Sequence, residues 1–231
     1  MSERVSSIRL AIWIVFAALI SILNFAAYSS SSSTSSTKTA LFQWSTAVGS
    51  VSLAALWVAI SFAISSSRSD LRALRRPQIS LAAVFGLGLL VLVATFAANA
   101  IVSEFGGNPA REQGLLTEHW QTGHGAAFAA NAAALVVLAP FSEELFVRGL
   151  GFGLFRPIGR GVSIIVPALA WALMHGIPAA ILPLAVFGIG LGYLRERSNS
   201  VVPGIFVHGF FNGLALTLAY GHSISHLFFG H

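Results

Sequence analysis

Six long stretches of the sequence contain no Asp, Glu, Lys or Arg, and they restrict the fold more than any other feature. Each is long enough to cross the hydrocarbon core of a bilayer, which takes about 20 apolar residues. Hydrophobic residues make up 55% of the chain and charged residues only 9%, with a mean hydropathy of +0.79, which excludes a soluble globular domain. The stretches are residues 10–37, 39–67, 77–103, 119–142, 161–194 and 198–231.

These stretches predict an all-α, polytopic integral membrane helix bundle of about seven transmembrane helices. The stretch 161–194 is long enough to fold back on itself and supply two spans. The first apolar segment is longer than the 7–15 residues usual in a signal peptide, so we interpret it as an uncleaved span. The predicted spans lie near residues 10–28, 40–65, 79–102, 126–153, 161–180, 181–195 and 200–221.

The arginines predict the orientation of the spans. Ten arginines fall at the N-terminus and in alternate loops. The only basic residues in the intervening loops are Lys38 and Arg111. Cytoplasmic loops collect Lys and Arg. We therefore expect the N-terminus inside and the C-terminus outside.

The stretch LAPFSEELFVRG places Glu143, Glu144 and Arg148 within one predicted span. A charged side chain near the bilayer centre costs roughly 2.5–3.5 kcal/mol on insertion scales. The two glutamates are also the only carboxylates inside any predicted span. Charged residues in this position are functional candidates by default.

The two neighbouring glutamates have different predicted roles. Residues four apart share a helix face, so Glu144 meets Arg148 in an ion pair that neutralises both charges. Glu143 projects about 100° away and has no partner on its own helix. An unpaired carboxyl group there is suited to proton exchange near neutral pH. We also expect Pro140 to free the carbonyl of Val136 and to kink the helix just before the pair.

Two later spans add polar side chains. The stretch WALMHGIP contains His175, with Trp171 one turn earlier on the same face, and HGFFNG places His208 and Asn212 four residues apart. At a rise of roughly 1.5 Å per residue, Glu143, His175 and His208 lie at depths of about 18, 21 and 12 Å. A single site is therefore geometrically possible. For Asn212, a hydrogen bond to a neighbouring helix is the alternative role.

Three ordered motifs, EELFVR (143–148), WALMH (171–175) and HGFFN (208–212), resemble those of CPBP-type intramembrane proteases. That family includes the type II CAAX prenyl endopeptidases and the bacteriocin-processing or immunity proteins formerly called Abi. The resemblance covers roughly residues 125–220, and the first three spans carry no motif. One departure is Trp171, where the family usually has Phe.

The resemblance implies that Glu143 and His175 activate a water molecule for attack on a peptide carbonyl, and that His208 and Asn212 bind the oxyanion. A carboxylate–imidazole pair can deprotonate water. An amide and an imidazole can donate to developing negative charge. The predicted function is therefore an intramembrane endopeptidase acting on membrane-associated or prenyl/peptide-like substrates, with the site supported by Glu144, Arg148 and Trp171.

The cofactor requirement stays open at this point, because the family has been described both as metalloproteases and as glutamate proteases. Glu143, His175 and His208 could hold Zn²⁺ with one open position. The sequence contains neither an HExxH motif nor a cysteine ligand. We favour metal-free glutamate catalysis.

Two other functions are compatible with the same residues. A proton-coupled transporter could use Glu143 as its relay, although repeats and broken helices would then be expected in both halves of the chain. A non-catalytic membrane partner or an immunity-type protein could keep the same fold.

The expected organisation has three parts: residues 1–124 with the first three spans and an external loop, residues 125–221 as the catalytic core, and residues 222–231 as an external tail. We expect a multi-pass protein of the bacterial plasma membrane whose partners are the lipid bilayer and a peptide or membrane-protein substrate. The net charge of +5 reflects loop arginines, so no nucleic-acid partner is predicted. The remaining histidines are expected on loops and on the tail: His119, His124, His222, His226 and His231.

Overall fold

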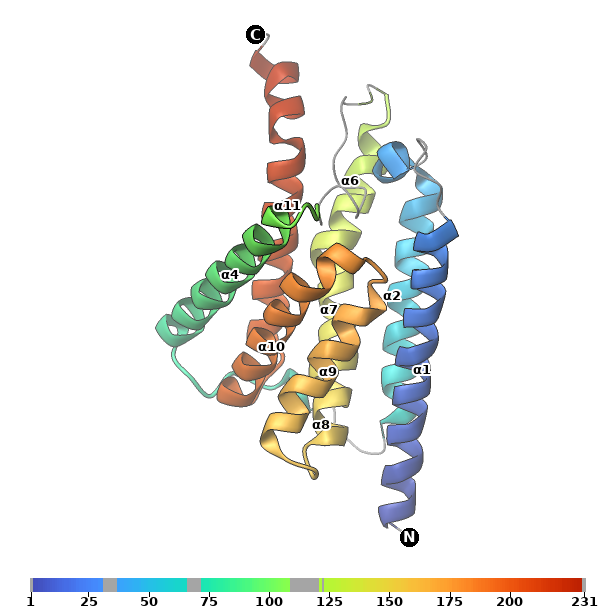
Figure 1. Cartoon of the computed structure of the whole chain (residues 1–231), viewed down its shortest axis with the longest axis vertical. Helices are drawn as coiled ribbons and strands as arrows, with labels where there is room; N and C mark the ends of the chain where they lie inside the picture. The colour runs from blue at the N-terminus through green and yellow to red at the C-terminus, as the bar shows by residue number, and fades with distance from the viewer. Residues whose placement is uncertain (1, 31–36, 66–71, 109–120, 122, 230–231) are drawn as a thin grey trace.

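The computed structural model describes residues 2–30, 37–65, 72–108, 121 and 123–229, and these residues form helices and connecting turns without any strand. This confirms the all-α class. By length and composition, six helical segments of the described chain can cross a membrane (Figure 1). These segments are Ser7–Ser30, Trp44–Ile64, Leu81–Glu104, Gly125–Phe155, Pro178–Ser198 and Val202–Tyr220.

The predicted fifth span, residues 161–180, is shorter than expected. Helix α9 (Arg160–Met174) has 15 residues, or about 22 Å of rise, which is less than the roughly 30 Å hydrocarbon core. The helix stops because Gly176 adopts φ +67, a conformation that glycine takes without steric cost, and Pro178 follows. A short 3₁₀ turn, η5 (Pro178–Ala180), then leads into α10 (Ile181–Ser198).

The segment Gly125–Phe155 is one continuous helical path with two π-helical turns. Its parts are α6 (Gly125–Ala133), η3 (Ala134–Leu138, π), α7 (Ala139–Glu144), η4 (Leu145–Gly151, π) and α8 (Phe152–Phe155). Such π turns are rare and occur frequently at functional sites.

The helix is irregular just before Pro140, where the π turn η3 lies. The carbonyl that accepts a hydrogen bond from another helix is that of Leu135, whereas the prediction concerned Val136. In a π turn the carbonyl of Leu135 would accept from residue 140, and proline has no N–H to donate. That carbonyl instead accepts from Nδ2 of Asn212, at 2.9 Å. The carbonyl of Val136 lies against α11, since a Cβ added at Gly209 would sit 2.6 Å from its oxygen.

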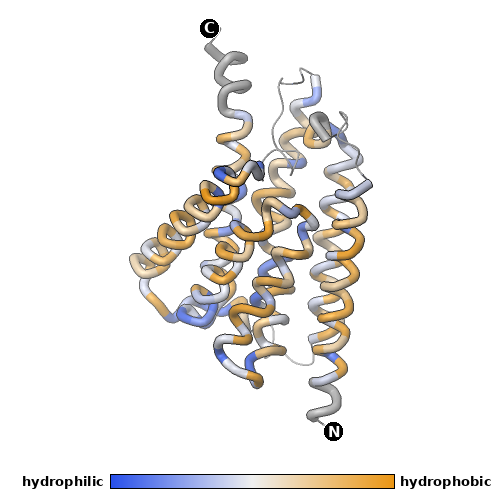
Figure 2. The backbone as a smooth tube through the Cα atoms, viewed as in Figure 1, coloured by the Kyte–Doolittle hydropathy of each residue, from blue (hydrophilic) through white to orange (hydrophobic). Residues whose placement is uncertain are grey.

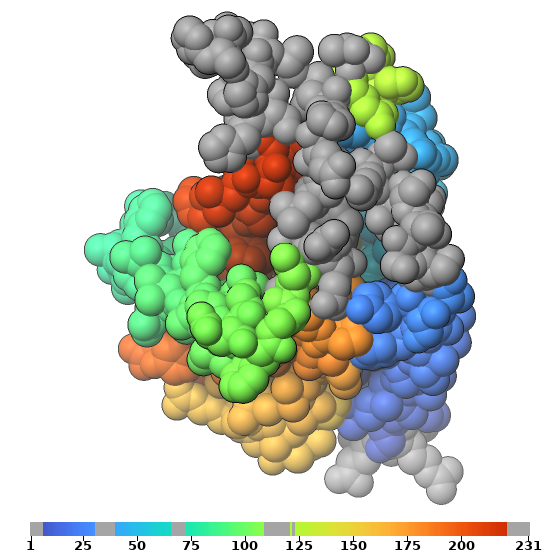
Figure 3. All heavy atoms as spheres, turned by 45° about the horizontal axis from the view of Figure 1, so that its top comes forward, coloured from blue at the N-terminus to red at the C-terminus, as the bar shows by residue number. Residues whose placement is uncertain are grey.

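The segment Gly125–Phe155 lies in the middle of the bundle (Figure 1). Helices α1 (Ser2–Ser30) and α2 (Trp44–Ile64) pack on one side, and α11 (Val202–Phe229) packs on another. Helix α4 (Leu81–Glu104) lies against α10 and beside α11 (Figure 3). The core is centred on Phe146, whose ring lies 5.4 Å from Trp13 and 4.6 Å from Trp57 between centroids.

The outer faces of the helices are apolar (Figure 2). Val15 on α1 and Phe85 on α4, for example, are 65% and 75% exposed. Large exposed hydrophobic side chains over this area suit contact with lipid rather than with water.

Candidate active site

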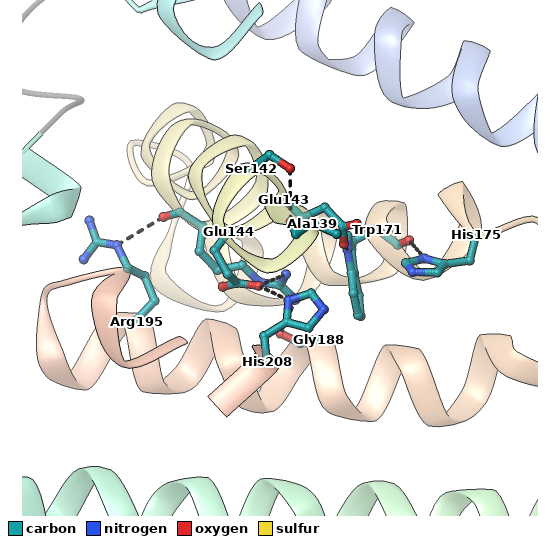
Figure 4. Close-up of polar contacts among 10 residues, drawn as sticks. Ala139, Ser142, Glu143, Glu144, Trp171, His175, Gly188, Arg195 and His208 are labelled. Atoms are coloured by element: carbon teal, nitrogen blue, oxygen red, sulfur yellow. Dashed lines mark hydrogen bonds and ion pairs between the residues drawn. The ribbon is translucent and has the colours of Figure 1, made fainter. Parts of the chain in front are cut away.

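The three sequence motifs meet in the interior of the bundle (Figure 4). Glu143 and Glu144 end α7, Trp171 lies in the last turn of α9 with His175 directly after that helix, and His208 lies on α11. A cavity of about 480 Å³ opens between these elements. The motif residues that line it are Glu143, Trp171, His175, His208 and Asn212.

Glu144 is the centre of a fully buried polar network. Its Oε1 accepts from Nη1 of Arg148 at 2.7 Å, so the predicted ion pair is present. Arg148 also donates from Nη2 to the carbonyl of Gly188 at 3.1 Å, which fixes the guanidinium against α10. Exposed fractions of 0% for Glu144 and 2% for Arg148 show that this pair has no access to solvent.

His208 belongs to the same network, a contact that the sequence did not predict. Its Nδ1 lies 3.2 Å from Oε1 of Glu144. A carboxylate accepts hydrogen bonds only, so Nδ1 carries a proton. Nε2 is therefore the ring atom left for other partners, and it donates only when the ring is an imidazolium.

A glycine on α11 makes this approach possible. Oε2 of Glu144 has no hydrogen-bond partner among the described residues, and a Cβ added at Gly204 would lie 2.8 Å from it. Any side chain at position 204 would therefore push α11 away from Glu144. Nothing in the sequence singles out Gly204. A glycine within a helix marks a close contact between helices only once the position of the neighbouring helix is known.

Glu143 turns away from this network and is half-buried at the cavity. It has no partner on its own helix, as predicted, but its Oε2 accepts from the indole N–H of Trp171 at 2.6 Å (Figure 4). Its Oε1 makes no hydrogen bond to any residue in the described part of the chain. One carboxylate oxygen is thus held in place and the other is available at the cavity.

Trp171 also contacts Arg148, His175 and His208. The guanidinium carbon of Arg148 lies 4.8 Å from the Trp171 ring centroid. The rings of His175 and His208 meet it edge-on, at centroid distances of 4.6 and 5.3 Å. A phenylalanine, the usual residue here in the resembling family, could make the ring contacts but has no N–H for Glu143.

His175 is oriented by the end of α9. Its Nδ1 lies 2.8 Å from the carbonyl oxygen of Trp171. A carbonyl oxygen only accepts, so Nδ1 carries the proton in this contact and Nε2 of the neutral ring holds the free lone pair. His175 lines the same cavity as Glu143, so this lone pair is an imidazole base on the wall that also carries the available carboxylate oxygen.

Asn212 has two uses for its amide group. One N–H donates to the carbonyl of Leu135, the helix–helix role that the sequence left open. The side chain also lines the cavity, and an amide nitrogen carries a second N–H. The bond to Leu135 fixes the direction in which this second hydrogen points.

The metal requirement stays a prediction for the residues suggested for zinc. Within the described ranges of the chain, no three His, Asp or Glu side chains are grouped so that they could hold one metal ion. Glu143, His175 and His208 line one cavity, and both histidines turn Nδ1 towards protein oxygens, which leaves Nε2 of each ring for another partner.

His124 is the remaining histidine whose side chain the structure describes, and it is exposed at the start of α6, as predicted for a surface residue. The predictions for His119, His222, His226 and His231 lie outside the described side chains. Most of the serine- and threonine-rich stretch 29–37, and most of residues 103–125, also lies outside the described residues.

The cavity has a second wall that sequence reasoning missed. Thr95, Phe96 and Asn99 of α4 line it together with the motif residues. They lie outside the region of family resemblance, so no motif pointed to them. The available signal was the pair of polar residues four positions apart in an otherwise apolar helix.

Residues 125–214 match the model of the family described as Type II CAAX prenyl endopeptidase Rce1-like. The match agrees with the resemblance carried by the three motifs, and the matched range contains every motif residue of the site. No curated protein and no solved structure matches the chain.

Proposed function

Because residues 125–214 match the model of the Rce1-like family of type II CAAX prenyl endopeptidases, we propose that the chain is an intramembrane endopeptidase in which Glu143 and His175 activate water. The observation that carries the proposal is the placement of these two side chains on one cavity, with a free carboxylate oxygen and a free imidazole nitrogen. Neither group is used by the buried ion pair.

The first step is general-base catalysis. Water donates a proton to Oε1 of Glu143 or to Nε2 of His175, and its oxygen attacks the carbonyl carbon of the scissile peptide bond. The electron pair of the C=O bond moves to oxygen and forms a tetrahedral oxyanion. When the C–N bond then breaks, the stored proton passes to the leaving nitrogen, which departs as an amine.

The oxyanion is stabilised from α11. His208 as an imidazolium donates from Nε2, and Asn212 donates with the N–H that does not bind Leu135. In this step the carboxylate of Glu144, whose Oε1 lies 3.2 Å from Nδ1, would pair with the imidazolium. Glu144 and Arg148 position the site without touching the reacting atoms.

The substrate class follows from the lining of the cavity and from the family description. Besides the motif residues the cavity is mostly apolar, with Phe96 of α4 and Phe211 and Leu218 of α11 among its walls. Such walls suit a lipid-modified or hydrophobic peptide segment. We propose a prenylated peptide as the substrate.

The test is cleavage of two quenched fluorescent peptides by the purified full chain in lipid nanodiscs. One ends in S-farnesyl-cysteine followed by two aliphatic residues and a terminal residue, and the other lacks the farnesyl group. Glu143→Gln keeps the shape of the side chain but removes the base, so cleavage falls at least about 10²-fold with an unchanged melting temperature. Glu196→Gln is the matched control, because that glutamate pairs with the exposed Arg156 and Arg160 outside the site.

The same assay separates the alternatives. A Glu143→Gln variant as active as the wild type rules out the proposed base. Loss of wild-type cleavage on adding a chelator, restored by Zn²⁺, would replace the metal-free mechanism with a metal-dependent one. Binding of the peptide without cleavage by the wild type would favour a non-catalytic partner of the same fold.

A further inference from the structure

Helix α4 carries an asparagine that the catalytic proposal does not use. Asn99 is half-buried in the span Leu81–Glu104 and lines the cavity, one turn after Thr95. Polar side chains inside a membrane span are costly, and they face the bundle interior or a pathway for a ligand. Asn99 faces the cavity.

The asparagines of the other spans show what is unusual about Asn99. Asn24 donates to the carbonyl of Met174, Asn131 donates to the carbonyls of Leu41, Gln43 and Ala127, and Asn212 donates to Leu135. Each of these amides ties helices together. The side-chain amide of Asn99 makes no hydrogen bond to any residue that the structure describes.

The neighbouring threonine does not supply this missing partner. The hydroxyl of Thr95 donates to the carbonyl of Val91 at 2.8 Å, one turn earlier on the same helix. Thr95 is buried at 2% exposure, so it fills the wall of the cavity beside Asn99. The Asn99 amide is therefore left as a polar group with free hydrogen-bonding capacity on the α4 side of the cavity.

We infer that Asn99 binds a peptide group of the substrate beside the scissile bond, an inference that rests on the proposed endopeptidase function. A carboxamide carries a donor and an acceptor in one plane, which matches the N–H and C=O of a peptide bond. In an apolar cavity such a pair is worth more than in water. Asn99 then fixes the peptide across the cavity while Glu143 and His175 act on the carbonyl.

This inference gives α4 a role in substrate binding. The helix lies outside the family match at residues 125–214, so the N-terminal part of the chain supplies a specificity-determining residue to the motif-bearing part. Relatives with an apolar residue at this position would hold the same peptide less tightly.

The experiment measures KM and kcat for the farnesylated peptide with Asn99→Leu, which keeps a similar volume without hydrogen bonds. We expect KM to rise about tenfold with little change in kcat, because one neutral hydrogen bond to the bound substrate is lost. Ala100→Leu is the control: it adds leucine at the next position of α4, where the side chain is exposed, and should leave both constants unchanged.

Ester analogues of the peptide, in which one amide N–H at a time is replaced by oxygen, identify the peptide group. In the wild type, one non-scissile ester should weaken binding about tenfold, and the same ester should cause no further loss with Asn99→Leu. Equal losses in both proteins, or an unchanged KM for Asn99→Leu, would overturn the inference. So would an equal loss with Ala100→Leu.

Binding of the labelled peptide to Glu143→Gln, with and without Asn99→Leu, separates this inference from the catalytic proposal. If the wild type does not cleave but Asn99→Leu still weakens binding about tenfold, the catalytic proposal fails and the binding role stands. If the wild type cleaves and Asn99→Leu binds normally, only the binding role fails. If the wild type does not cleave and the peptide binds to neither variant, both are overturned.

Discussion

The N-terminal helices α1, α2 and α4 and the motif-bearing segment 125–214 each contain a buried tryptophan, and the two tryptophans have different roles. Trp13 and Trp171 are both 1% exposed and both donate an indole N–H. Trp13, on α1, donates to the backbone carbonyl of Phe146 at 3.2 Å and stacks on that ring. Trp171, in the motif-bearing segment, donates to the carboxylate of Glu143 at 2.6 Å and contacts Arg148. In the first region the indole completes packing, whereas in the second it orients a charge.

Other polar groups divide in the same way. In α1, α2 and α4, the hydroxyls of Ser21, Ser61 and Thr95 donate to carbonyls one turn earlier on their own helices. In the motif-bearing segment, Glu144 is bonded to Arg148 and to His208 of another helix. The N-terminal helices therefore support and enclose the site, and the motif-bearing segment contains its charges. Asn99 is the exception, because it adds a polar group from the N-terminal side.

The largest expected effect is the loss of stability when the buried ion pair between Glu144 and Arg148 is broken. Glu144→Gln leaves Arg148 without its carboxylate in a site closed to solvent, so we expect a loss of about 3–5 kcal/mol in the free energy of unfolding. Thermal unfolding in detergent measures this.

The control for that measurement is Glu196→Gln, which breaks an ion pair with arginines that are 48% and 55% exposed. Such a pair is worth about 0–1 kcal/mol. Equal melting temperatures for the two variants would contradict the assignment of Glu144 as the centre of the buried network.

The tryptophans provide the second comparison. Trp171→Phe removes the N–H that holds Glu143, and a hydrogen bond to a charged group contributes roughly 1.5–3 kcal/mol, so kcat should fall roughly 10- to 100-fold. Trp13→Phe should lower the melting temperature but leave kcat unchanged. A similar fall of kcat in both variants would show that packing alone explains Trp171.

The smallest effect on stability is expected at the contact between α4 and α10. A Cβ added at Gly190 of α10 would lie 2.5 Å from a methyl group of Val91 on α4. Gly190→Ala should therefore cost about 1–3 kcal/mol through overpacking, and Val91→Ala in the same chain should restore much of it.

Gly86→Ala is the matched control for this contact, because a Cβ at Gly86 meets nothing within 4 Å. It should leave the melting temperature unchanged or raise it, since alanine favours a helix more than glycine does. Failure of Val91→Ala to rescue Gly190→Ala would show that α4 does not depend on this close approach.

The sequence by itself determined the membrane class, the order of the motif segments and the pairing of Glu144 with Arg148. Uninterrupted apolar length is a local property, and residues four apart share a helix face whatever surrounds the helix. The early end of α9 also has a local signal, Gly176 followed by Pro178. Residues 161–194 contain no Asp, Glu, Lys or Arg, however, and this uninterrupted stretch predicts a longer span there.

Only the tertiary structure decided which groups meet across helices. The bonds from Trp171 to Glu143, from His208 to Glu144 and from Asn212 to Leu135 join residues 28, 64 and 77 positions apart. Helical periodicity says which way a side chain points on its own helix, but the rotation and closeness of neighbouring helices depend on packing between them. Gly204 and Asn99 acquire their roles from that packing alone, since one makes room for Glu144 and the other faces a cavity formed by several helices.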